Sequence, residues 1–130
     1  MADSPLLQLV RDSIVEVLQA RRFINLEEIL ESYPVLQEQM NCQVEIFLED
    51  KLRASYKTSQ ELSLAENIFI CAKKAAFEDP NNPPLKIREY LHSEIVLTLF
   101  TPQGEMHQKS EALLQKGDTT PFMGVAKEFT

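Results

Sequence analysis

Three prolines and two asparagines fill residues 80–84, and this short cluster constrains the fold more than any other stretch of the chain. The Asp-Pro step that opens it cannot continue a helix, because proline lacks an amide donor and restricts the residue before it. The asparagines suit tight turns, and the closing Pro-Pro pair extends the backbone and reduces the entropy lost on folding. The cluster therefore predicts a rigid crossover from a helix to a later strand, with Leu85 as its anchor in the core.

Upstream of this crossover, local signals predict two helices. Ser4 precedes a proline and then apolar residues that recur at helical spacing, which predicts an amphipathic helix over 5–22. A second helix is expected to begin at Asn25, with Glu28 in a capping box, and to stop at Pro34.

The hydrophobic period changes to two after these helices, which predicts strands. Within residues 42–49, the apolar Cys42, Val44, Ile46 and Leu48 alternate with Gln43, Glu45, Phe47 and Glu49, which predicts a strand with one buried face. After a turn, residues 52–57 can form a second strand that runs back along the first. A further helix opens at Ser63, with Glu66 in a capping box, and ends in the crossover. Residues 95–100, IVLTLF, then read as a strongly apolar central strand.

This order of elements predicts an α+β fold rather than a regular βαβ repeat. At 130 residues the chain is long enough for one domain with a core and too short for two. Residues 105–130 form a weakly defined C-terminal segment, in which a short helix over 110–117 is expected.

The net charge is −7, and one segment holds the whole excess of acids. Between Phe23 and Asp50 lie seven acids and no lysine or arginine, so the rest of the chain balances at 13 acids against 13 bases. Overall acidity argues against nonspecific nucleic-acid binding, which depends on cations at phosphates. The acidic segment is either a solvated face or a docking face for a basic partner, with Glu27, Glu28 and Glu31 as candidate contacts.

The expected compartment follows from what the sequence lacks. No apolar run has the length that a bilayer-spanning helix needs, and no secretory signal precedes the first helix. The two cysteines, Cys42 and Cys71, lie in apolar-periodic stretches without a disulfide framework. We therefore expect two buried, reduced thiols in a cytoplasmic protein with no membrane partner.

A basic stripe on the second strand is the candidate ligand site. Strand alternation places Lys51, Arg53, Ser55 and Lys57 on one face. Two cations beside Ser55 could hold a carboxylate or phosphate, and its hydroxyl could be a nucleophile if a base lay within reach. The alternative is an ordinary solvated sheet face. Arg53, Ser55 and Lys57 are therefore candidate ligand-binding residues, and no catalytic residue is assigned.

Other chemistries have less support. His92 and His107 lie 15 residues apart with no cysteine or acid at ligand spacing, so no metal site is expected. Glu78 and Asp79 are adjacent at a helix end, which suits surface or capping roles better than an acid–base pair. The three glycines form no phosphate-binding loop, and no cofactor is expected.

The crossover and its continuation, AAFEDPNNPPL followed by KIREYLHSEIVLTLFTP, resemble the signature of the AMMECR family. That signature has two small residues, an aromatic residue, Asp-Pro, two further residues, Pro-Pro, a Glu-Leu stretch and an apolar strand ending in proline. The resemblance covers residues 75–102, with weaker similarity in the first helix, in VEIFLEDKLRAS and in TTPFMGVAKEF. It implies the family's fold, an antiparallel sheet flanked by helices, with the crossover as a shared structural element.

One departure from the family concerns a cysteine. After its first hairpin turn the family has Leu-Arg-Gly-Cys-Ile-Gly, and this chain has LRASYK. Leu52 and Arg53 match, but Ala54 and Lys57 replace the glycines, and Ser55 stands where the cysteine would be. The chain therefore resembles a reduced or divergent member that lacks the thiol.

Two functions remain open. The resemblance implies an association with Memo-type and radical-SAM proteins, and so a role beside a modification pathway. The first hypothesis is a non-enzymatic interaction module that docks onto a protein partner through the acidic segment or through the crossover around Asp79 and Pro80. The missing thiol favours it, since a binding fold survives such a loss more easily than an enzyme. The alternative is a small enzyme or anion-binding domain that uses Arg53, Ser55 and Lys57.

Overall fold

The N-terminal helix α1 (Pro5–Leu18) begins where the sequence predicts. Ser4 Oγ accepts a hydrogen bond from the Leu7 amide at 3.2 Å, and Pro5 fills the first helical position, where its missing donor costs nothing. The predicted end at residue 22 is wrong, because Ala20 takes a left-handed backbone conformation (φ 53°) just after the helix stops.

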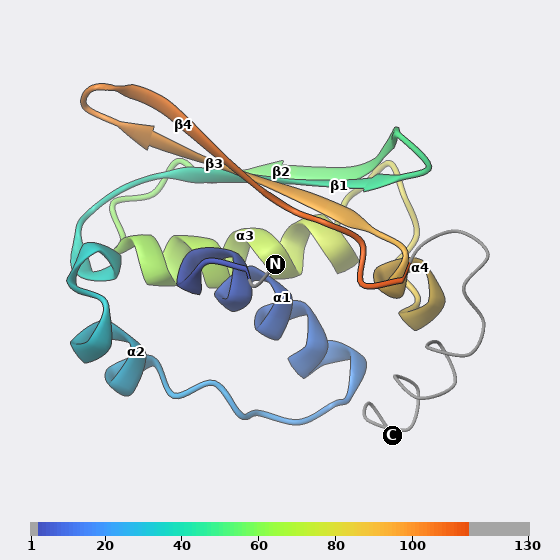
Figure 1. The fold of residues 1–130 in the computed structure, drawn as a ribbon, viewed down its shortest axis with the longest axis horizontal. Helices are drawn as coiled ribbons and strands as arrows, with labels where there is room; N and C mark the ends of the chain where they lie inside the picture. The colour runs from blue at the N-terminus through green and yellow to red at the C-terminus, as the bar shows by residue number, and fades with distance from the viewer. Residues whose placement is uncertain (1–2, 115–130) are drawn as a thin grey trace.

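The computed structural model describes residues 3–114, and in this part of the chain α1 and the later helices lie on one face of a four-stranded sheet (Figure 1). The strands are β1 (Cys42–Leu48), β2 (Lys51–Lys57), β3 (Glu94–Thr101) and β4 (Gly104–Ser110). They pair antiparallel throughout in the order β2-β1-β3-β4. The α+β fold with an antiparallel sheet flanked by helices is therefore confirmed.

β4 is the element that the sequence pattern does not predict. Residues 104–110 form a strand where only weak structure is expected. Residues 111–114 are not helical, and the rest of the helix predicted over 110–117 lies outside the described residues. Most side chains of β4 are exposed, so the strand lacks the apolar alternation that identifies a half-buried one.

Helices α2 and α3 begin at the predicted caps. α2 (Leu26–Ser32) is capped by Asn25, whose side chain accepts from the Glu28 amide at 3.1 Å, and the 3-10 helix η1 (Pro34–Gln37) follows it. α3 (Leu64–Phe77) is capped by Ser63, whose hydroxyl accepts from the Glu66 amide at 3.2 Å. None of the helices within residues 3–114 has the length and apolarity that crossing a bilayer would require.

The core lies between the sheet and α1 and α3. Small residues on α3, among them Cys71, Ala72 and Ala75, are fully buried and allow the helix to lie close beneath the strands. The thiol of Cys71 donates to the Tyr56 carbonyl at 2.8 Å. A hydrogen bond with Cys42 and burial together raise the pKa of the Cys71 thiol. Both cysteines are buried and free, as the sequence predicts.

Candidate functional site

The crossover leads from α3 to a short helix, α4 (Ile87–Leu91), and hydrogen bonds fix its path. The Asp79 carboxylate accepts from the Asn81 amide at 2.9 Å, from the Asn82 side chain at 3.1 Å and from the Ser55 amide of β2 at 3.4 Å. These hydrogen bonds hold the pKa of the Asp79 carboxyl below its ordinary value, and the bond from the Asn81 amide has the largest effect. Leu85 fixes the end of the crossover, because its amide donates to the Ala76 carbonyl in the last turn of α3 at 2.7 Å and its side chain is buried.

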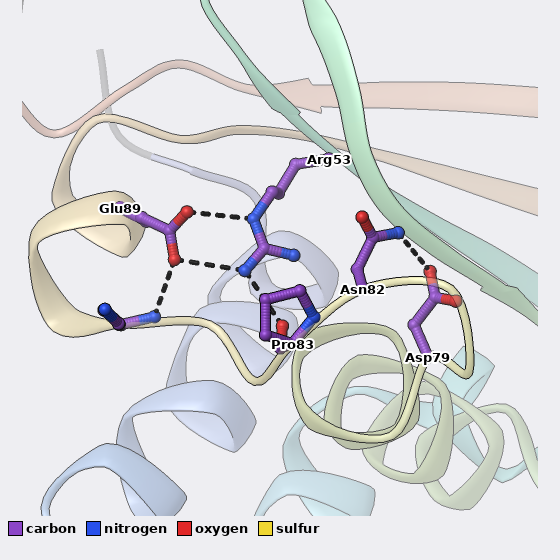
Figure 2. Close-up of polar contacts among 6 residues, drawn as sticks. Arg53, Asp79, Asn82, Pro83 and Glu89 are labelled. Atoms are coloured by element: carbon purple, nitrogen blue, oxygen red, sulfur yellow. Dashed lines mark hydrogen bonds and ion pairs between the residues drawn. The ribbon is translucent and has the colours of Figure 1, made fainter.

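Arg53 ties the crossover to β2 and α4 (Figure 2). Its Nε donates to Glu89 Oε2 at 2.9 Å and its Nη2 to Glu89 Oε1 at 3.1 Å, so the ion pair is bidentate. Nη2 also donates to the Pro83 carbonyl at 2.9 Å, and Glu89 Oε1 accepts from the Lys86 amide at 3.0 Å. We call these four residues the Arg53 clamp.

The charge of Arg53 is paired with Glu89, although Arg53 Nη1 is buried without a hydrogen-bond partner among residues 3–114. The Arg53 side chain is only 12% exposed, so its charge is largely removed from water. Its hydrogen bonds are the first cause that keeps the pKa of the Glu89 carboxyl below its ordinary value, against the opposing effect of burial. Arg53 is therefore already neutralised within the chain, which leaves it poorly suited to bind an external anion.

The crossover shields one edge of the sheet. β2 is an edge strand, and its amide at Ser55 is taken up by Asp79. Unpaired strand edges invite association with other chains, and covering them is a common protection. The predicted crossover is confirmed, with α4 added before β3, and its polar groups are used within the fold.

The prediction that the basic residues of β2 share one face is wrong at Lys51 and Arg53. Lys51 lies opposite Leu48, on the face of β1 that also carries Ile46, whereas Ser55 lies opposite Glu45 on the other face. Leu52 lies opposite Phe47 and Ala54 lies opposite Ile46, so Arg53 has no partner on β1. This register shift is a β-bulge, which interrupts the alternation of the strand and re-aims a side chain. Arg53 therefore turns toward the crossover.

Ser55 and Lys57 lie opposite Glu45 and Gln43 of β1, on the sheet face opposite to the one that carries the buried Val44 and Ile46. Lys57 Nζ lies 4.5 Å from the centroid of the Phe100 ring, which is a cation–π contact. Among residues 3–114 no side chain hydrogen bonds to Ser55 Oγ, so the base that a nucleophile requires is not in place there. The structure thus does not bring Arg53, Ser55 and Lys57 together around one point.

The two candidate partner surfaces lie apart. Glu27, Glu28 and Glu31 are exposed on α2, whereas Asp79 and Pro80 lie in the crossover. Figure 1 shows α2 at one end of the molecule and the crossover, between α3 and α4, at the other. Because they lie at opposite ends of the molecule, they form two separate candidate binding surfaces.

α2 is the helix that contributes least to the core, since none of its residues is buried. Three of its apolar side chains pack only partly against the core. Around it, Phe23 is 40% exposed, Tyr33 is 42% exposed and Val35 is 39% exposed. Acidic and apolar groups therefore share this end of the molecule. We call it the α2–η1 surface, formed by Phe23, Glu27, Glu28, Glu31, Tyr33 and Val35.

Glu16 is a positioning residue that the sequence analysis missed. It is buried on α1, and its carboxylate accepts the Phe23 and Ile24 amides at 2.9 Å each and Lys73 Nζ at 3.1 Å. Burial alone would raise the pKa of the Glu16 carboxyl, but the hydrogen bonds outweigh burial and the pKa lies below its ordinary value. The loop that leads into α2 is therefore anchored to α1 and α3. Its only sequence signal is an acid beside the apolar face of a helix.

Both histidines and Glu78 have ordinary partners within the fold. His92 Nδ1 lies 3.2 Å from the Leu114 carbonyl, and His107 Nδ1 lies 2.8 Å from Thr98 Oγ1. Glu78 lies 3.7 Å from Lys74 Nζ, away from the Asp79 turn. Within residues 3–114 no three His, Cys, Asp or Glu side chains gather as metal ligands would.

Comparisons with known proteins add information on the fold. No protein-family model matches this sequence, and no curated protein matches it. Among solved structures, the chain is similar to the uncharacterized protein PH0010 from Pyrococcus horikoshii, with a TM-score of 0.67 and 24% sequence identity. The similarity covers 78% of this chain and 54% of that one, so this chain spans about half the length of its neighbour. At this identity the likeness shows the α+β fold alone.

Proposed function

We propose that this chain is a divergent AMMECR-type domain that acts as a non-enzymatic interaction module. Two of the stretches that resemble the family support the assignment, because a side chain of one forms an ion pair with a side chain of the other. Residues 75–102 form the end of α3, the crossover, α4 and β3, in one continuous run. Arg53, which matches the family's Leu-Arg step, binds Glu89 within that run.

The exposed acidic helix α2 carries the interaction role. A helix that buries no residue adds little to the core, yet this one is held in place through the loop that Glu16 anchors. Exposed apolar side chains rimmed by charged ones are typical of protein-binding surfaces. The crossover is less suited to this role, because Asp79 and Arg53 already serve the fold.

The composition of the α2–η1 surface defines the partner. Three carboxylates on one short helix, with no lysine or arginine between Phe23 and Asp50, complement a basic segment. Exposed Phe23, Tyr33 and Val35 require that this segment also carry apolar side chains. We therefore propose a protein partner with a basic amphipathic segment. The AMMECR resemblance directs the search toward Memo-type and radical-SAM proteins.

Affinity capture with charge-matched variants tests this proposal. The wild type is compared with Glu27→Gln/Glu28→Gln/Glu31→Gln and with a control, Glu61→Gln/Glu78→Gln/Glu111→Gln, whose three acids are exposed elsewhere. Each variant loses three negative charges, so general acidity is equal. A partner with a basic contact segment should be retained by the wild type and the control, and recovered at least about tenfold less by the α2 variant. Equal recovery by all three proteins would overturn the proposal.

A further inference from the structure

The two edges of the sheet are treated differently by the fold. The edge formed by β2 is covered by the crossover, through Asp79 and the Arg53 clamp. The opposite edge is β4, and among residues 3–114 no strand pairs with its outer side. An exposed strand edge is a template for pairing with another strand.

The backbone groups available on this edge follow from the register. The Phe100 amide donates to the Asn41 carbonyl, on the β1 side of β3, at 3.1 Å. Because neighbouring residues in a strand alternate in direction, Leu99 faces β4 instead and forms a hydrogen-bonded pair with Met106. The amides and carbonyls of Glu105, His107 and Lys109 therefore point away from β3, toward the open edge.

Among the side chains at these three positions, an acid and a base lie two residues on either side of His107. Glu105, His107 and Lys109 are 59%, 60% and 52% exposed. An antiparallel copy of the same strand, centred on His107, places Glu105 opposite Lys109 of that copy, and Lys109 opposite its Glu105. Both cross-strand pairs then carry opposite charges, which stabilises a sheet.

We propose that β4 pairs with β4 of a second copy of this chain, antiparallel and centred on His107. The two sheets of four strands then join into one. A shift of the register by two residues sets His107 opposite Glu105 or Lys109 of the copy and removes both Glu105–Lys109 pairs, so the charges favour the centred register. Lys109 already pairs with Glu94 at 3.1 Å and Glu111 at 3.8 Å, and Glu105 lies 3.7 Å from His107. Because the side chains of Glu105 and Lys109 are more than half exposed, each can also contact its oppositely charged partner on the second copy.

The proposed pairing leaves the α2–η1 surface available. β4 lies in the sheet layer, and α2 lies below that layer, at the end of the molecule away from α4 (Figure 1). The inference therefore goes beyond the proposed function and does not depend on it. A dimer would present two α2–η1 surfaces, which increases avidity for a partner with repeated basic segments.

Charge reversal on β4 tests the pairing by sedimentation over micromolar to millimolar protein. Glu105→Lys sets lysine opposite lysine in both pairs, and Lys109→Glu sets glutamate opposite glutamate. Each variant alone should dimerise at least about tenfold more weakly than the wild type. An equimolar mixture of the two restores both opposite-charge pairs and should form a one-to-one dimer.

A backbone variant provides the second readout. His107→Pro removes an amide that points to the open edge, so the β3–β4 pairing should survive while the dimer is lost. Circular dichroism checks that each variant is folded. A wild type that stays monomeric over the whole range would overturn the proposal. A dimer that neither the charge reversals nor His107→Pro weakens would also overturn it, because its interface would then lie elsewhere.

Discussion

Replacing Arg53 with methionine is expected to lower the free energy of unfolding by about 2 to 3 kcal/mol. Methionine keeps part of the aliphatic chain but removes the bidentate pair with Glu89 and the donor to the Pro83 carbonyl. The Glu89 carboxylate is 30% exposed and keeps the Lys86 amide, so the loss stays below that of a fully buried pair. Urea unfolding at neutral pH measures the change.

The stabilisation by the Arg53 clamp should also depend on pH. Because the folded-state pKa of Glu89 lies below its ordinary value of 4.5, the pair stabilises fully above that pH. The stabilisation is lost as pH falls through the folded-state pKa. Arg53→Met lacks this contribution at every pH, so the unfolding free energies of the wild type and the variant should converge in acid.

Lys51→Met is the matched control for Arg53→Met. Lys51 is an exposed cation of the same strand, and its replacement should change stability by less than about 0.5 kcal/mol. Equal losses in the two variants would contradict the clamp. So would an Arg53→Met protein as stable as the wild type, which would restore Arg53 as a free ligand-binding residue.

Replacing Arg11 with methionine is expected to cost about 3 kcal/mol, through a different buried network. Arg11 lies on α1 and is 2% exposed. Its guanidinium donates to the Ser93 carbonyl at 2.9 Å, to the Glu111 carbonyl at 2.8 Å and to Ser110 Oγ at 2.9 Å. Removing it leaves these acceptors near the ends of β3 and β4 without their donor.

Gln8→Met on the same helix is the control for Arg11→Met. Gln8 is exposed, and its side-chain amide donates to the nearby Asp12 carboxylate at 2.9 Å. Chemical unfolding should separate the two variants by more than about 2 kcal/mol. A loss below about 1 kcal/mol at Arg11 would mean that its network contributes little beyond its own desolvation cost.

The parts of the fold that the sequence predicts are those set by local chemistry. Ser4, Asn25 and Ser63 cap helices because a short polar side chain can reach an amide three residues ahead. The strand at 42–48 shows its buried face through alternation. The crossover follows from proline alone, since its ring forbids a helix whatever surrounds it.

The parts that the sequence does not predict depend on distant partners. The bulge at Arg53 accompanies a bidentate ion pair with Glu89, which lies 36 residues later in the sequence. Arg11 and Glu16 look like ordinary helix charges until β4 and the loop before α2 bury them. β4 itself lacks alternation because it is an exposed edge. The candidate site changes accordingly, from a stripe on β2 to an exposed helix.

Site-specific photocrosslinking at the α2–η1 surface tests the central claim most directly. A photoreactive phenylalanine analogue replaces Phe23 or Tyr33, and in two controls it replaces Leu52 or Leu113, which are exposed elsewhere. After irradiation in a lysate of the native host, mass spectrometry identifies each crosslinked peptide. We predict adducts from positions 23 and 33 to a basic segment of one protein, and none from positions 52 and 113. Adducts confined to the control positions, or to an acidic segment, would contradict the assignment of the α2–η1 surface.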